Sequence, residues 1–468
     1  MFLLISTLAV GTLLIVSIRW YLNISQRLTD VPGPPVPSFI VGNVLELEQA
    51  PMGTLLLRWA KQYGQTFKIA GPLYQPWLIL SDPIGVNHVL QGKNYIRPAA
   101  DRQVLELFLK QQYEALLETS SDGVIDIAPN IHMLAEISFV IRLDAISMTM
   151  FMHNISASEG RIPSLLHEIT NSPTGDYFTV VAETLASLFP SILLLPNPLK
   201  SYTDNLRKEF TVIAEEVWSG KHGAGMHAKV LDALGPDHYK AKDKTADGSP
   251  ISKEEAIAQI IGVMFAGSET TANVVVECLY ELAKHPSIQT RLREEFHSFQ
   301  AQSGHFPTYE ELMNGSSLPY FEAVIRETLR TKAVLREIGR MAVEDDVIPL
   351  HFPLPSGRKQ VSVKAGEIIQ VSIRDGVNSD PEIWGSDASE FRPDRWLIED
   401  KLPEVVKALR AQGHLYTFGD GSKVCLGRTF DNGYQFDFYH LGGNTIKPKI
   451  RGRESEGVQL LLKVAPLS

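Results

Sequence analysis

The stretch FGDGSKVCLGRTF, residues 418–430, surrounds one of only two cysteines in the 468-residue chain. Phe418 opens it, and Gly421 and Gly427 stand four residues before and two residues after Cys425. Glycine permits backbone conformations and close approaches that other residues cannot adopt, so such a loop can direct N–H groups at a sulfur and favour the thiolate. A buried, inert cysteine beside a tight turn is the alternative. The four-residue pattern favours a thiolate held toward a flat, bulky cofactor.

The composition narrows the class of protein. Hydrophobic residues make up 44% of the chain and charged residues 21%, which is typical of a globular protein with a sizeable core. A formal net charge of -10 argues against nucleic acid as a partner, because it implies no strongly basic face. Two cysteines cannot make a disulfide framework, so we expect the body of the protein to face a reducing compartment.

The N-terminus has the character of a membrane anchor. Residues 2–18 carry no charge and span about 25 Å as a helix at ~1.5 Å per residue. Basic and aromatic residues follow at 19–21 and suit a membrane interface, with the body on the cytoplasmic side. A cleaved signal peptide is the competing interpretation. We therefore expect an anchor at 1–20, a stiff Pro-rich linker at 21–37 that contains VPGPPVP, and one domain at 38–468.

The periodicity predicts a mainly α fold with a small β portion. Short strands are expected within 65–71 and 77–83, and again in 358–373, where Lys364-Ala365-Gly366 suits a hairpin turn. Most of 84–345 is expected to be helical. The clearest helix begins at Ser252, which can form a capping box with Glu255, and stops at Pro286. Its middle is apolar on nearly all sides, so it is expected to cross the centre of the domain.

Three further motifs accompany the cysteine in a fixed order. They are Ala266-Gly267-Ser268-Glu269-Thr270-Thr271, Glu327-Thr328-Leu329-Arg330 and Phe391-Arg392-Pro393-Asp394-Arg395-Trp396. Glu-x-x-Arg alone carries little weight, since it recurs at Glu337 and Arg340. Taken in order with Cys425, the set resembles the cytochrome P-450 family of haem-thiolate monooxygenases, in particular fungal members of the membrane-bound eukaryotic class. The resemblance covers most of the chain from the anchor to Cys425.

The resemblance implies a cytochrome P-450 fold and a role for each motif residue. Cys425 would be the axial thiolate ligand of the iron of haem b, with Phe418 beside the sulfur and Gly421 and Gly427 shaping the loop. Lys423 stands where the family usually has an arginine near a haem propionate, and Arg340 matches another propionate-binding arginine. Glu327, Arg330 and Arg395 would form a buried structural triad. Ala266 and Gly267 would open a groove in the long helix, where Glu269 and Thr270 would help deliver protons during O₂ activation.

The implied activity is insertion of one oxygen atom from O₂ into a small, mostly apolar molecule of secondary metabolism. The chain has no Walker-type or dinucleotide-binding fingerprint, so electrons must come from another protein. The resemblance implies NADPH–cytochrome P-450 reductase, with cytochrome b5 as an optional second donor, at the endoplasmic reticulum membrane. A reductase-independent isomerase or dehydratase is an alternative, although Glu269 and Thr270 argue against it because such relatives need no proton delivery to O₂.

The chain also departs from the family pattern. The helix that should follow the Arg97-Pro98 region, with its Trp–Arg pair, is apparently missing. So is the helix after the Cys loop, since residues 429–446 are too rich in Gly and Asn to form it. Lys332 replaces a common family histidine. A degenerate or mis-spliced member without stable haem or activity is therefore a further alternative.

Overall fold

The computed structural model describes residues 28–50, 53–99, 101–102, 177–218, 253–308, 311–312, 315–398 and 401–425. Packing divides the chain into two compact units. Unit 1 combines residues 1–98, 173–189 and 337–380, and unit 2 combines 99–172, 190–336 and 381–468. Within the described residues the secondary structure is mainly helical with a small β portion, as predicted.

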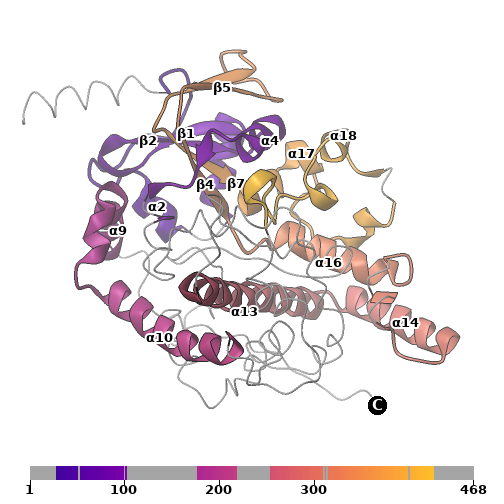
Figure 1. Cartoon of the computed structure of the whole chain (residues 1–468). Coiled ribbons are helices and arrows are strands. Elements are labelled where there is room, and N and C mark those ends of the chain that lie inside the picture. The colour runs from indigo at the N-terminus through magenta and orange to yellow at the C-terminus, as the bar shows by residue number, and fades with distance from the viewer. Residues whose placement is uncertain are drawn as a thin grey trace, which may run out of the picture. The chain divides into compact units, whose positions relative to one another are not determined.

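A five-stranded sheet forms the centre of unit 1 (Figure 1). Its order is β1 (Thr66–Ala70), β2 (Pro76–Leu80), β7 (Ile368–Ser372), β4 (Glu337–Ala342) and β3 (Tyr95–Ile96). β2 and β7 run parallel, and the other three pairs are antiparallel. The sheet therefore joins strands from both ends of the chain, and the predicted strands at 65–71 and 77–83 are confirmed as β1 and β2.

The predicted hairpin at 364–366 is wrong. The turn itself is present, because the N–H of Glu367 donates to the carbonyl oxygen of Lys364 over 3.0 Å and Gly366 has a φ of +82°. However, β6 (Gln360–Val363) pairs with β5 (Asp346–Pro349) in a separate sheet, whereas β7 pairs with β2 and β4. Their side chains explain the split. β6 alternates exposed and buried positions, while β7 is mostly apolar and suits the centre of a sheet.

Unit 1 also contains short helices. They are α2 (Val44–Gln49), α3 (Leu55–Tyr63), α4 (Pro83–Gln91), α9 (Tyr177–Leu188), the 3₁₀ turn η1 (Pro72–Tyr74) and the π-type turn η5 (Ile373–Val377). The apolar sides of α2 and α3 pack onto β1 and β2. The buried cluster that results consists of Leu47, Leu55, Leu56, Trp59, Phe67, Ile69 and Ile79.

The Pro-rich linker, from residue 28 onward, lies against the edge strand β1. The backbone N–H of Lys68 donates to the carbonyl oxygen of Pro32 over 2.8 Å, and its Nζ donates to that of Leu28 over 2.7 Å. Asn43 continues the pairing. Its N–H donates to the carbonyl oxygen of Ala70, and its Oδ1 accepts from the N–H of Ala70. This part of the linker thus belongs to unit 1 rather than standing free of it.

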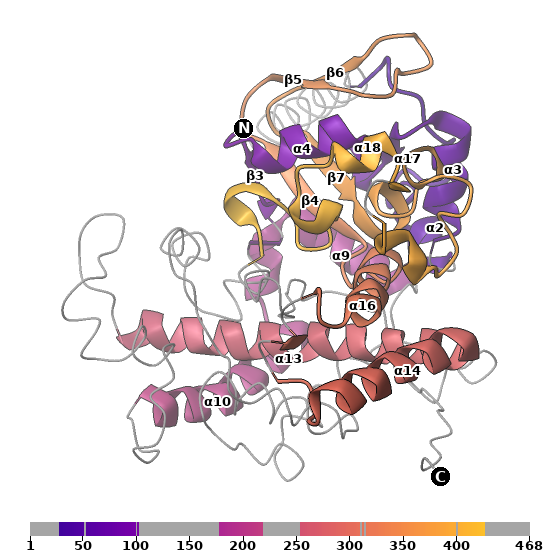
Figure 2. The same cartoon turned by 90° about the vertical axis from the view of Figure 1, so that its right-hand side faces the viewer.

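Unit 2 is built around α13 (Lys253–Lys284), which contacts α10 (Pro198–Trp218), α14 (Pro286–Ser303) and α16 (Pro319–Thr331) (Figure 2). The long helix predicted to end before Pro286 is therefore confirmed. The shorter elements of unit 2 are η4 (Pro190–Leu194), α17 (Pro381–Trp384), η6 (Pro393–Trp396), α18 (Glu404–Lys407), η8 (Gln412–His414) and η9 (Gly421–Lys423).

Several predicted features lie outside the described residues. They are the anchor at 1–20, the capping residue Ser252 and the segment after the Cys loop. After Arg97-Pro98, residues 99, 101 and 102 are helical, and 103–176 are not described. Within the described ranges, no helix is long and apolar enough to cross a membrane.

Candidate haem-thiolate site

Two glycines shape the loop that leads to Cys425. Gly419 and Gly421 have φ values of +68° and +72°, in the left-handed region that favours glycine. The chain folds back so that the N–H of Cys425 donates to the carbonyl oxygen of Phe418 over 3.0 Å. Cys425 is buried, and the half-buried Lys423 ends the short η9 turn before it. Gly427, the other predicted loop glycine, lies outside the described residues.

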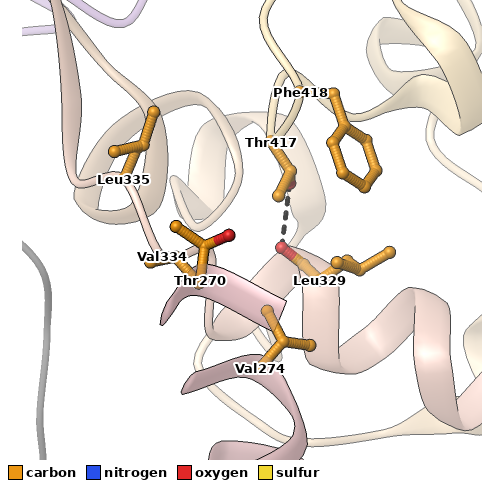
Figure 3. Close-up of a pocket in the computed structure, with 7 residues that line it drawn as sticks. All are labelled: Thr270, Val274, Leu329, Val334, Leu335, Thr417 and Phe418. Carbon is orange, nitrogen blue, oxygen red and sulfur yellow. Dashed lines mark hydrogen bonds between the residues drawn. The ribbon is translucent and has the colours of Figure 1, made fainter. Parts of the chain in front are cut away.

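A small pocket in unit 2 lies between α13 and the Cys loop (Figure 3). Its cavity volume is about 10 Å³, roughly the room that one water molecule needs. The walls are mostly apolar and carry two hydroxyl groups. They consist of Thr270 and Val274 from α13, Leu329, Val334 and Leu335 from the end of α16 and the segment after it, and Thr417 and Phe418 from the Cys loop.

Thr270 places one hydroxyl at this pocket. Its side chain is 5% exposed, and Oγ1 lies 3.5 Å from the carbonyl oxygen of Ala266 one turn earlier. A hydrogen bond of that length is weak, so the hydroxyl can turn toward another partner at little cost. Gly267 and Glu269 lie in α13, but the side chain of Glu269 lies outside the description. The helix runs from Lys253 to Lys284 as one element, and the predicted groove stays a prediction.

The structure brings Glu327, Arg330 and Arg395 together in unit 2. Arg330 donates to both carboxylate oxygens of Glu327, through Nε over 2.9 Å and Nη2 over 2.8 Å. Arg395 adds a bond from Nε to Oε1 over 3.0 Å. The side chains of Glu327 and Arg330 are fully buried and that of Arg395 is 4% exposed, so water cannot replace these partners. The geometry makes the triad a structural element that joins α16 to η6.

Sequence reasoning missed two further donors to Glu327. The backbone N–H of Arg392 donates to Oε1 over 2.9 Å, and the indole Nε1 of Trp396 donates to Oε2 over 2.9 Å. Arg330 in turn donates to the carbonyl oxygens of Ala388 and Glu390. The available signal was the position of Arg392 and Trp396 in the same short motif as Arg395. A single carboxylate therefore organises the whole motif.

Unit 1 contains two buried arginines. Arg340, in β4, is 2% exposed, and Arg97, one residue beyond β3, is 7% exposed. The antiparallel register pairs Tyr95 with Ala342 and Ile96 with Met341, and the pairing ends there, one residue before Arg97. Sequence reasoning did not assign Arg97 a role, although its position directly after a β3 strand paired with β4 was the signal.

The donor set of unit 2 suits iron in a haem. The described residues contain no group of three or more His, Cys, Asp or Glu side chains that could hold a metal ion by themselves. A haem needs only one protein ligand of the right type, because the porphyrin nitrogens supply the equatorial positions, and a cysteine thiolate is such a ligand. The pocket walls beside Phe418 are mostly apolar, as the faces of a porphyrin ring are.

Comparison with known proteins identifies the family. The family model described as cytochrome P-450 matches residues 127–431, which is more than half of the chain. The chain belongs to the cytochrome P-450 family. It is therefore a monooxygenase-type oxidoreductase, and the family implies haem iron as its cofactor.

Similar fungal proteins align with almost the whole chain. Cytochrome P-450 monooxygenase claU of Ampulloclitocybe clavipes is 30% identical, covering 94% of this chain and 93% of the relative. claW of the same organism is 29% identical over 93% of this chain and 92% of the relative. Cytochrome P-450 monooxygenase 205 of Postia placenta is 26% identical, with 87% and 83% covered.

Proposed function

We propose that the protein is a haem-thiolate monooxygenase that inserts one oxygen atom from O₂ into a small, apolar organic substrate. The observation that carries the proposal is the pocket bordered on one side by Thr270 and on another by Phe418, whose carbonyl accepts from the N–H of Cys425. These are the residues that the family pattern assigns to the two faces of the haem. A haem iron bound by a cysteine thiolate supplies the activation of O₂.

Each protein residue has a defined task in this proposal. The Cys425 thiolate holds the iron, and Phe418 packs beside the ring. Lys423 carries positive charge that would balance a haem propionate, and the family resemblance assigns the same task to Arg340. Lys423 does so as a point charge, since its ammonium lacks the bidentate fork of arginine.

Proton supply is assigned to α13. We infer that the Thr270 hydroxyl holds a proton at Oγ1 and passes it toward the pocket, with Glu269 as the relay that replenishes it. The long contact with Ala266 supports this role because a weakly bound hydroxyl is available to reorient. Ala266 and Gly267 would provide the local opening in the helix.

The pocket walls support an apolar substrate. Val274, Leu329, Val334 and Leu335 present only hydrocarbon, so a polar substrate would lose its hydration without regaining hydrogen bonds there. The two hydroxyls of the walls, on Thr270 and Thr417, offer limited polar contact. Thr417 already donates its hydroxyl to the carbonyl oxygen of Leu329 over 2.9 Å.

The electron source and the location follow from the sequence. The chain lacks a dinucleotide-binding fingerprint, which supports delivery of electrons from NADPH by a separate reductase, with cytochrome b5 as a second donor. The uncharged segment at 2–18 supports an anchor at 1–20 in the endoplasmic reticulum membrane, a linker at 21–37 and a cytoplasmic domain at 38–468.

One observation favours a second candidate, a chain that lacks stable haem. The alignment with claW extends over 515 residues, which exceeds the 468 residues of this chain, so some positions are occupied only in the relative. This supports the absence of tens of residues relative to that protein. The departures from the family pattern would put the gaps after the Arg97-Pro98 region and after the Cys loop. Loss of these helices would remove part of the haem lining.

Purification of the full-length chain with haem supplied during expression distinguishes the two candidates. The proposed function predicts close to one haem per chain. It also predicts the Soret band specific to thiolate ligation when the protein is reduced and carbon monoxide is then added. Cys425→Ala should abolish that band, whereas Cys278→Ala, which removes the other cysteine, should leave it. A haem content far below one per chain would favour the second candidate. Substrate conversion without reductase or O₂ would instead indicate an isomerase or dehydratase.

A further inference from the structure

Lys332 connects the end of α16 to α13 through a largely buried ion pair. It is the C-cap residue of α16, and its Nζ lies 2.8 Å from Oε1 of Glu281 and 3.9 Å from Oε2 of Glu277. The side chain of Lys332 is 19% exposed and that of Glu281 only 2%. The pair therefore crosses between two helices in an environment where screening by water is weak.

The two acidic residues share a helix face with the pocket. Thr270, Val274, Glu277 and Glu281 follow one another at intervals of four, three and four residues along α13. Residues at such spacing form a single stripe on a helix. The first two line the pocket, and the last two receive Lys332. The ion pair thus lies on the same stripe of α13 that forms the pocket wall.

The C-terminal end of α16 has two attachments. Leu329 lines the pocket, and its carbonyl oxygen accepts the hydroxyl of Thr417 from the Cys loop. Val334, also a pocket residue, follows Lys332 by two positions. The last turn of α16 is therefore bonded to the Cys loop through Leu329 and to α13 through Lys332.

We propose that Lys332 and Glu281 are a positioning pair that fixes the distance between the Thr270 face of α13 and the pocket wall formed by residues 329–335. The pair thereby sets the size of ligand that the pocket accepts. The inference rests on the proposed haem function, because ligand size is measured at the iron. Neither residue touches the substrate; both act through the wall that they hold.

The energetics support the pair. Burial would raise the pKa of the Glu281 carboxyl, but hydrogen bonding and charge from Lys332, with a smaller contribution from Lys284, outweigh burial and lower that pKa. Glu281 is therefore ionised and needs its cation. Lys284 belongs to the same helix as Glu281, at 3.2 Å and half exposed, so it cannot hold α13 to α16. Without Lys332, the buried carboxylate would draw in water or shift, and the two helices would lose their fixed separation.

The test compares Lys332→Met with Lys332→Arg and with the matched control Lys284→Met. In the haem-loaded, full-length protein, the dissociation constants of imidazole and 1-phenylimidazole are measured from the Soret shift, and their ratio reports ligand-size selection. Lys332→Met should change this ratio about threefold to tenfold, the range of coupling between contacting residues. Lys332→Arg and Lys284→Met should remain near the wild-type ratio. Equal ratios in wild type and Lys332→Met, or an equal change in Lys284→Met, would overturn the proposal.

A second measurement is independent of haem. A double-mutant cycle with Lys332→Met, Glu281→Gln and the double variant is followed by urea unfolding of the full chain. The double variant should be more stable than the sum of the two single effects predicts, since it leaves no buried charge unpaired. Additive effects would refute the pair itself. If the cycle shows this coupling but the wild-type chain takes up no haem, the proposed function and the pocket role are contradicted. The ion pair between Lys332 and Glu281 would still be confirmed.

Discussion

The indole Nε1 of Trp396 donates a hydrogen bond to Oε2 of Glu327 over 2.9 Å, in the interior of unit 2. The same carboxylate accepts from Arg330, Arg395 and the backbone of Arg392, so none of its hydrogen-bonding capacity depends on water. This convergence makes Glu327 the point at which α16 and η6 are held together.

Trp396→Phe should lower the stability of unit 2 by about 1–3 kcal/mol, because it leaves one buried acceptor site of Glu327 without its donor. The substitution keeps an aromatic ring against Trp384, whose ring centre lies 5.6 Å away. Urea unfolding followed by hydrogen exchange in residues 319–331 would measure the change. Trp77→Phe in unit 1 is the control, since the buried Nε1 of Trp77 has no hydrogen-bond partner within the described residues. Equal losses in the two variants would contradict the role of the Trp396 bond.

Glu327→Gln should be more damaging, by about 3–5 kcal/mol, because two buried guanidinium groups lose their counter-charge. We expect little soluble protein and little bound haem, measured as yield and as Soret absorbance per chain. Glu322→Gln is the matched control on the same helix. Its ion pair with Arg326 is partly exposed, so its loss should change stability by under about 1 kcal/mol. Normal yield from Glu327→Gln would show that the triad is not required for folding.

Asp82→Asn should destabilise unit 1. The buried carboxylate of Asp82 accepts from four backbone N–H groups, two at the start of α4 and two from residues 351 and 352. An asparagine amide presents one acceptor oxygen and an NH₂ group that cannot accept. With that oxygen in the place of Oδ1, which accepts three of the four bonds, the N–H of residue 352 would face another donor. The expected loss is about 1–3 kcal/mol in urea unfolding, the cost of one unsatisfied buried group. Asp30→Asn, at an exposed ion pair with Arg358, should change little.

The stabilising effect of Asp346 should depend on pH. Burial would raise the pKa of this carboxyl, but hydrogen bonds from His88 and Tyr95 outweigh burial and lower that pKa. A depressed folded-state pKa gives stability that is fully present above the ordinary value of about 3.9 and is lost as pH falls through the folded value. Asp346→Asn should therefore be less stable than wild type at pH 7, and the gap in urea midpoint should stay constant down to about pH 5 and narrow below about pH 4. A gap that widens on acidification would contradict this linkage.

Thr270→Ala should reduce the fraction of consumed O₂ that appears as product, because the hydroxyl proposed to hold a proton is removed. Thr270→Ser keeps that hydroxyl and should stay close to wild type, while Thr270→Val keeps the volume and should resemble Thr270→Ala. Peroxide release and product are quantified at equal haem content, and a loss of coupling of about 100-fold is expected, the lower end of the usual range for proton-transfer groups. Unchanged coupling in Thr270→Val would remove the proton role.

Much of the site could be predicted because its residues lie in short, ordered motifs. The long apolar run around Ala266 predicts α13, and Glu327, Arg330 and Arg395 meet as the pattern requires. Strand pairing could not be predicted in the same way. The turn at Gly366 was predicted correctly, but the strand that follows it does not pair across that turn. β7 pairs with β4 and with β2, which lies about 290 residues earlier in the sequence, and no local pattern indicates these partners.

Contacts made by backbone atoms were also hidden from sequence reasoning. The partner of Glu327 at Arg392 is an N–H group that every non-proline residue carries, so residue type gives no signal. The ion pair of Lys332 with Glu281 depends on how α13 and α16 lie against each other, and the sequence shows only that a lysine occupies an unusual position. The burial of Arg97 was not predicted for a similar reason, because β4, the partner of the preceding strand β3, is far away in the sequence.

The attachment of the linker to β1 has a practical consequence for producing the protein. A soluble version cut at residue 38, after the Pro-rich stretch, would strip Pro32 and Leu28 from Lys68 and uncover the outer edge of β1. Bare sheet edges are templates for intermolecular association. A cut before Leu28 would retain this cover, so the shorter truncation, although it removes the same predicted anchor, should give the more soluble product.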